Sequence, residues 1–99
     1  VGWDSEGRFH SDDIVEQTRQ ALQNVVAVLA EAGGKPEHIV RITWYVTNKR
    51  EYLDAGRAIG AVFRETIGAY NAAMSAVEVS ALMEDRAKIE IEATAVLPE

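Results

Sequence analysis

Two glutamates on one predicted strand are the residues of this sequence best suited to acid–base chemistry. Glu90 and Glu92 alternate with Ile89 and Ile91, so the two carboxylates project from the face opposite the two apolar side chains. A carboxylate on a strand is usually solvated. In a partly closed cleft, however, burial would raise its pKa, and the group could then orient or activate a water molecule.

Other residue types that often carry catalysis lack the spacing that their chemistry requires. His10 and His38 fall in predicted loops and form no HxH or HExxH motif, so the sequence offers no zinc site. Ser75 and Ser80 lie on a predicted strand without a nucleophile elbow or a nearby histidine. Cysteine is absent, which excludes a disulfide framework and a thiolate nucleophile. The glycine pair at 33–34 ends a helix, so it forms neither a P-loop nor a dinucleotide fingerprint.

Length and composition indicate a single globular domain over residues 1–99. Of the 99 residues, 47% are hydrophobic and 26% are charged, and the formal net charge is −6. This acidic balance and the scattered basic residues argue against nucleic-acid binding. Neither an apolar run of membrane-spanning length nor a secretory signal is visible. A disulfide-free acidic domain fits the cytoplasm. A chain this short buries only about two thirds of its surface, and oligomerisation would supplement its core.

Hydrophobic periodicity predicts two helices. The first runs over about 13–32, with Asp13 and Glu16 as a start that resembles a capping box and Gly33 as the stop. The second is expected over about 48–67. Two amphipathic helices on one face of a mixed sheet make an α+β sandwich.

Period-two alternation predicts the strands of that sheet. The segment IVRITWYVT (39–47) is the most strongly patterned. YNAAMSAVEVS (70–80) also reads as a strand, with bounds of about 73–80, and another follows at about 87–96. Residues 1–4 read as the end of a further strand that enters a turn. In the strand predicted over 39–47 one face is apolar: Val40, Ile42, Trp44 and Val46.

The sheet face that the helices leave free is predicted to be mixed in character. A monomer core would not contain three glutamates, and a fully solvated face would seldom contain Tyr and Met. Such a patchy face is typical of a subunit interface with water-lined gaps, which symmetric self-association commonly covers. The residues expected on it are Arg41, Thr43, Tyr45, Met74, Ala76, Glu78, Glu90, Glu92 and Thr94.

Several motifs together resemble the YjgF family, also called the Rid (reactive intermediate deaminase) family. The resemblance spans about residues 11–97 and is carried by QTRQALQN, IVRITWYVT, SAVEV and IEIEATAV. It implies a chorismate-mutase-like fold and a homotrimer with three ligand clefts between subunits. Members of this family hydrolyse enamines and imines, such as 2-aminoacrylate, to a 2-keto acid and ammonia, and they use no metal or organic cofactor. Some relatives are called L-PSP endoribonucleases.

The resemblance also assigns roles to individual residues and marks departures from the family pattern. The family's P-A-R-S motif holds the substrate carboxylate through its arginine. Here it is matched by Ala72-Ala73-Met74-Ser75, so Met74 stands at the arginine position. The water-positioning glutamate of the family matches Glu90, and its small residue two positions after the arginine matches Ala76. The family's opening hairpin has no counterpart before Val1, so it is either lost or missing from this chain.

The sequence therefore predicts a ligand cleft formed by Glu90, Met74, Ala76 and Tyr45. The expected activity is hydrolysis of imines or enamines, with an altered specificity that does not favour 2-aminoacrylate. Met74 either packs in the interface or lines a site for a neutral or apolar ligand. Two alternatives stay open: a non-catalytic trimer that binds a small metabolite or a protein, and an endoribonuclease, which the acidic balance opposes.

Overall fold

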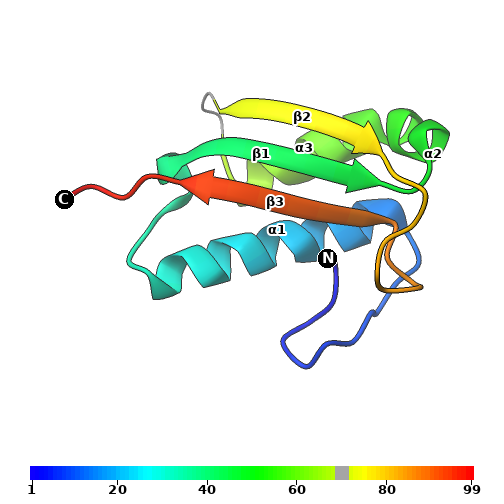
Figure 1. Cartoon of the computed structure of the whole chain (residues 1–99), viewed down its shortest axis with the longest axis horizontal. Coiled ribbons are helices and arrows are strands. Elements are labelled where there is room, and N and C mark those ends of the chain that lie inside the picture. The colour runs from blue at the N-terminus through cyan, green and yellow to red at the C-terminus, as the bar shows by residue number, and fades with distance from the viewer. Residues whose placement is uncertain (69–71) are drawn as a thin grey trace.

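The computed structural model describes residues 1–68 and 72–99, and it has two main helices packed on one face of a three-stranded sheet (Figure 1). The sheet order is β2-β1-β3, in which β1 is parallel to β2 and antiparallel to β3. The predicted α+β arrangement with a mixed sheet is thus confirmed. Tyr70 and Asn71, which open the segment read as the second strand, lie outside the described residues. In chain order the elements are α1 (Ile14–Glu31), the 3-10 helix η1 (Pro36–His38), β1 (Ile39–Val46), α2 (Lys49–Asp54), α3 (Gly56–Thr66), β2 (Ala73–Glu78) and β3 (Ile89–Ala95).

Helix α1 begins and ends at the residues that its sequence predicts. The Asp13 side chain accepts a hydrogen bond from Glu16 N at 3.2 Å, which satisfies one of the unpaired N–H groups of the first turn. At the other end Gly33 has a φ of 79°, and its N–H bonds to Ala30 O at 2.9 Å. Glycine adopts this left-handed conformation at little cost, so it ends the helix. In the described part of the chain no helix is long and apolar enough to cross a membrane.

The hydrophobic core lies between the sheet and helices α1 and α3. Its central aromatic residue is Trp44 on β1, whose ring centroid lies 6.5 Å from that of Tyr52 and 5.9 Å from that of Phe63, at tilted angles. Aromatic pairs favour such geometry. The buried core residues are Ile14, Ala21, Leu22, Ile39, Ile42, Trp44, Val46, Ile59, Val62, Ile67, Ile89 and Ile91.

A bulge at the start of β1 changes one predicted face. The register with β3 shifts between Ile39 and Arg41. As a result Val40 is 47% exposed, whereas Ile39 is 1% exposed. The prediction that Val40 is buried was wrong, because regular alternation does not anticipate the extra residue of a bulge. The other apolar side chains of the strand are buried as predicted: Ile42, Trp44 and Val46.

The predicted second helix is divided in two. Ala55 ends α2 with φ −91° and ψ 4°, outside the regular helical range, and α3 starts at the next residue. That residue is Gly56, and glycine has the weakest helix propensity after proline. The division lets α2 and α3 follow different directions while both remain on the same side of the sheet (Figure 1).

The prediction of a strand over residues 1–4 was also wrong. This segment has no strand assignment and is held instead by α1. Asn24 Nδ2 donates to Val1 O at 3.1 Å and to Trp3 O at 2.7 Å. One side-chain amide therefore satisfies backbone carbonyls that a neighbouring strand would otherwise bond.

Candidate functional site

The helix-free face of the sheet brings together two of the four predicted site residues. Tyr45 is opposite Glu90, and Thr43 is opposite Glu92, in the β1–β3 register. Residues directly opposite each other in adjacent strands project to the same face. Glu90 is half-buried, whereas Glu92 is exposed. We call Tyr45, Glu90 and Glu92 the carboxylate face.

Electrostatics keep the phenol of the carboxylate face protonated. Tyr45 Oη donates to Glu92 Oε1 at 3.4 Å. The pKa of Tyr45 is raised above its ordinary value, first by the charge of Glu92, then by loss of solvent, by the hydrogen bond to Glu92 and by the charge of Glu90. A protonated phenol donates a hydrogen bond, and an ionised carboxylate accepts a proton. The face can therefore hold a water molecule or a polar ligand and act as a general base.

Met74 and Ala76 lie on the opposite side of the sheet. In the parallel β1–β2 register Met74 is beside Ile42 and Ala76 is beside Trp44, and both of these neighbours belong to the core. The prediction that Met74 and Ala76 share a face with the two strand glutamates was therefore wrong. Alternation along a strand can be read from sequence, but the face that each set occupies depends on the register with the neighbouring strand.

Glu78 shows the same reversal. It was predicted on the helix-free face, yet it is beside Val46 in the register. Its Oε1 accepts a hydrogen bond from Lys49 N at 2.6 Å. The carboxylate thus satisfies an N–H group at the start of α2, where a negative charge is favourable.

A groove of about 370 Å³ lies between β2 and α3. We call it the β2–α3 groove. Met74 and Ala76 line it from β2, and Met74 is 47% exposed. Aromatic rings line it from β1, α2 and α3, and one cation is present at its edge: Trp44, Tyr52, Phe63 and Arg64.

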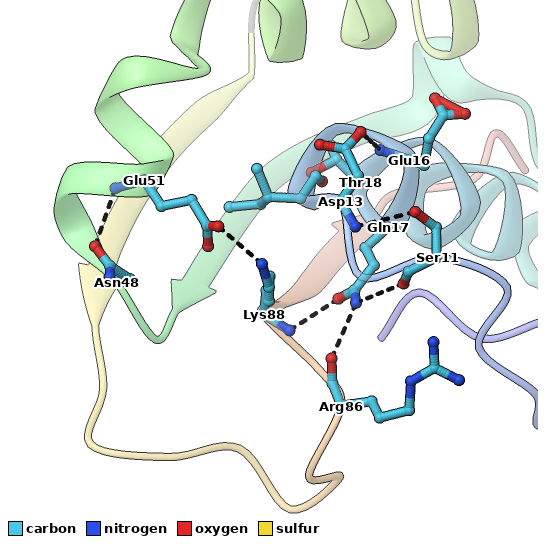
Figure 2. Close-up of polar contacts among 10 residues, drawn as sticks. Ser11, Asp13, Glu16, Gln17, Thr18, Asn48, Glu51, Arg86 and Lys88 are labelled. Carbon is cyan, nitrogen blue, oxygen red and sulfur yellow. Dashed lines mark hydrogen bonds and ion pairs between the residues drawn. The ribbon is translucent and has the colours of Figure 1, made fainter.

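A buried glutamine fixes the start of β3, the strand that carries Glu90 (Figure 2). Gln17 is 1% exposed. Its Nε2 donates to Ser11 O at 3.0 Å and to Arg86 O at 2.9 Å, and its Oε1 accepts from Lys88 N at 2.8 Å. Buried amide groups satisfied in this way hold segments in one arrangement. Sequence reasoning missed this role, although a glutamine next to Thr18 within an apolar stripe is the available signal.

The amino group of Lys88 extends the same cluster to the second helix. Lys88 Nζ lies 2.8 Å from Glu51 Oε2, and Glu51 N donates to Asn48 Oδ1 at 3.0 Å (Figure 2). The Glu51 carboxylate of this cluster is paired with Lys88, so we assign the cluster a structural role. Within residues 1–68 and 72–99, no group of three or more His, Cys, Asp or Glu is placed to hold a metal ion.

The protein is thus a small α+β domain with two main helices on one face of a mixed sheet. The family model described as Endoribonuclease L-PSP matches residues 1–97. The chain therefore belongs to this family, which is the YjgF/Rid family that its motifs resemble. The family prediction is confirmed.

Two curated relatives and one solved structure illustrate the similarity. The chain is 38% identical over 86 residues to the 2-iminobutanoate/2-iminopropanoate deaminase of Salmonella typhimurium, which covers 87% of this chain and 66% of the relative. It is 36% identical over 89 residues to a RutC family protein of Pyrococcus horikoshii, covering 90% and 67%. The Rid family protein YyfB of Yersinia pestis has a TM-score of 0.84 at 37% identity, covering 98% of this chain and 73% of that one. The chain thus spans about two thirds of the length of the curated relatives that it matches.

Proposed function

We propose that the chain forms a homotrimer that acts in the cytoplasm and hydrolyses imines or enamines in clefts between its subunits. The observation that carries this proposal is the similarity to proteins named 2-iminobutanoate/2-iminopropanoate deaminase from Salmonella typhimurium and Escherichia coli, at 38% and 39% identity. Glu90, a half-buried glutamate opposite Tyr45 in the strand register, supports it.

The geometry of one chain is the reason for placing the cleft between subunits. The carboxylate face and the β2–α3 groove lie on opposite sides of the same sheet. A cleft that contains both Glu90 and Met74 therefore needs the groove of one subunit and the carboxylate face of the next. A cyclic trimer, in which each subunit presents one surface to each neighbour, supplies this pairing three times.

The proposed reaction uses Glu90 as a general base. Glu90 accepts a proton from water while the water oxygen attacks the imine carbon, and a tetrahedral carbinolamine forms. The proton that Glu90 has taken passes to the nitrogen, which has gained the electron pair of the C=N bond. Glu90 then takes the hydroxyl proton of the carbinolamine and returns it to the amino group. Ammonia leaves as the C–N bond breaks, and the carbinolamine oxygen becomes the carbonyl oxygen of a 2-keto product. The hydroxyl proton of Tyr45 is donated to Glu92, so the phenol oxygen accepts a hydrogen bond from the water or the substrate and orients it.

Paired glutamine variants test the role of Glu90. Glu90→Gln keeps the size of the side chain but removes the base, so ammonia release from an active imine should fall at least about a hundredfold. Glu92→Gln, on the same face, is the matched control and should do much less. Imines can be generated from amino acids by an amino acid oxidase within the assay, and the released ammonia measured. Near-full turnover by Glu90→Gln would refute the assignment.

A second candidate function is a non-catalytic trimer that binds a small metabolite or a protein partner. The observation in its favour is Met74, an exposed apolar side chain at the position where the family resemblance places an arginine. If a broad panel of imines gives no ammonia above the uncatalysed rate, this function replaces the hydrolase. Endoribonuclease activity is the third candidate, and the net charge of −6 opposes it.

We expect 2-aminoacrylate to be a poor substrate. A hydrogen bond to a charged group contributes about 1.5–3 kcal/mol, and Met74 offers none to a carboxylate that lies where the family resemblance places the arginine. The catalytic efficiency should therefore be at least about tenfold below that of an arginine-bearing relative. Pyruvate release measured side by side for the two proteins checks this. Equal efficiency would contradict it, and Met74→Arg should raise the rate of this chain.

A further inference from the structure

Arg64 lines the β2–α3 groove but takes no part in the proposed reaction. It is in the last turn of α3. Among the described residues that line the groove, it alone is charged. The chain has 16 acidic and 10 basic residues, so acidic partners for a cation are plentiful. A cation that lies beside an apolar groove is therefore unusual.

Arg64 has no carboxylate partner within the described part of the chain. The acidic residue next to it, Glu65, accepts instead from Arg19 Nη1 at 2.6 Å. Arg64 Nη1 lies 3.5 Å from the position that a Cβ on Gly60 would occupy. The guanidinium group is thus folded back along α3 over a residue that also lines the groove, and its donors remain available.

The rest of the groove suits an apolar ligand. The packed rings of Trp44 and Phe63 line it, and so does Met74, from β2. Thioether groups make favourable contacts with aromatic rings and adapt to ligand shape. Gly56 also lines the groove, and a Cβ added there would meet nothing within 4 Å, so there is open space at this position. A volume of about 370 Å³ is within the range of small-molecule sites.

We propose that the β2–α3 groove binds a carboxylate with an apolar or aromatic body. Arg64 holds the carboxylate, since a guanidinium group presents two parallel N–H donors that match its two oxygens. The aromatic rings and Met74 enclose the body. The substrate class that follows is imines of amino acids with bulky apolar side chains. This last step rests on the proposed function, whereas binding of the carboxylate does not.

Binding of 3-phenylpropanoate, measured by isothermal titration calorimetry, tests the site without any turnover. The parent protein should bind it at least about tenfold more tightly than 3-phenylpropanamide, which lacks the charge, and than propanoate, which lacks the ring. Arg64→Gln should weaken binding of 3-phenylpropanoate by at least about tenfold. Arg57→Gln is the matched control, because Arg57 is an exposed arginine of α3 that does not line the groove.

A second variant checks the apolar part of the site. Gly56→Leu adds a side chain at a groove-lining position with open space around it, so it should reduce binding of 3-phenylpropanoate while the protein remains folded. Failure of the parent to bind 3-phenylpropanoate, or unchanged binding by Arg64→Gln, would overturn the proposal. Arg64-dependent binding by a protein that hydrolyses no imine would support this site and refute only the proposed hydrolase function.

Discussion

Strands β2 and β3 flank the same central strand, yet they differ in how completely they are covered (Figure 1). β3 alternates between buried and more exposed residues, packs against α1 and is fixed at its start by Gln17. β2 is exposed along all six of its residues. β3 therefore contributes buried side chains to the core, whereas β2 is an uncovered strand beside a groove.

Side-chain size explains much of the difference. β3 buries Ile89 and Ile91 against the helices. Three of the six residues of β2 are small, because the strand reads AMSAVE, so β2 offers little apolar surface to bury. Exposed edge strands are usually protected or paired in natural proteins. We therefore expect ligand and subunit contacts on the β2 side.

Mixed trimers provide the sharpest test of this comparison. Met74→Asp should disable the groove by adding a charge, and Glu90→Gln should disable the carboxylate face, so neither variant alone should hydrolyse imines. If each cleft combines the groove of one subunit with the face of the next, random mixing of the two variants restores roughly a quarter of the sites. Ammonia release before and after co-refolding measures the recovery. No recovery would show that the two surfaces do not share a cleft.

Truncating a buried side chain of β3 should lower the free energy of unfolding more than truncating an exposed side chain of β2. Ile89→Ala removes a fully buried side chain of β3 and should lower the free energy of unfolding by about 2–5 kcal/mol. Val77→Ala on β2 should change it by about 0.5 kcal/mol or less. Urea unfolding at a fixed protein concentration measures both. Similar losses in the two variants would mean that β2 is covered as fully as β3.

Replacement of Gln17 tests what fixes the β3 side. Gln17→Met leaves Lys88 N and two backbone carbonyls without their partner, and a buried unsatisfied group costs about 1–3 kcal/mol. Gln20→Met is the control on the same helix, because within residues 1–68 and 72–99 the Gln20 amide bonds only to Asn24 Oδ1, at 2.9 Å. We expect a clear loss of stability only for Gln17→Met. An equal effect of the two substitutions would assign the loss to helix packing in general.

The smallest expected effect is on the stability of the protein in acid, and it arises from Asp4 in the segment before α1. Asp4 Oδ1 accepts from Arg8 N at 3.0 Å and from Glu6 N at 2.8 Å, and Asp4 Oδ2 lies 2.5 Å from His10 Nε2. The backbone hydrogen bond from Arg8, followed by the side-chain hydrogen bond from His10, lowers the pKa of Asp4 to about 2.

Because the Asp4 pKa is lower in the folded protein than in the unfolded chain, the ionised group stabilises the fold above about pH 4, and this contribution is lost as the pH falls towards 2. Asp4→Asn should make the decline of stability between pH 4 and 2 less steep than in the parent, as measured by urea unfolding at each pH. Identical slopes would contradict this role.

The sequence predicted the features that depend on local chemistry. The caps of α1 could be predicted because Asp13 and Gly33 act on their own turns, and the three strands follow from alternation. The site was only partly predictable. The outward direction of Glu90 follows from its buried neighbours Ile89 and Ile91, but β2 has no buried residue that marks its inner face. The face of the sheet on which Met74 lies is therefore set by the register between β1 and β2, which the sequence does not reveal.

Two other features also lay beyond sequence reasoning. The bulge that exposes Val40 is a property of pairing between strands, and no turn residue marks it. The groove beside Arg64 combines β1, α2, α3 and β2, so its lining could be recognised only after the elements were assembled.

The hydrogen bonds of Gln17 also constrain the order in which the chain can fold. They join residues 69 and 71 positions apart in the sequence, and β3 pairs with a strand synthesised about fifty residues earlier. During translation, helix α1 leaves the ribosome long before Arg86 and Lys88 exist, so its buried amide has no native partners at that stage. Contacts of such high sequence separation form late and slow the search for the native state. The domain should therefore complete its core only after its C-terminal strand has emerged, in one cooperative step.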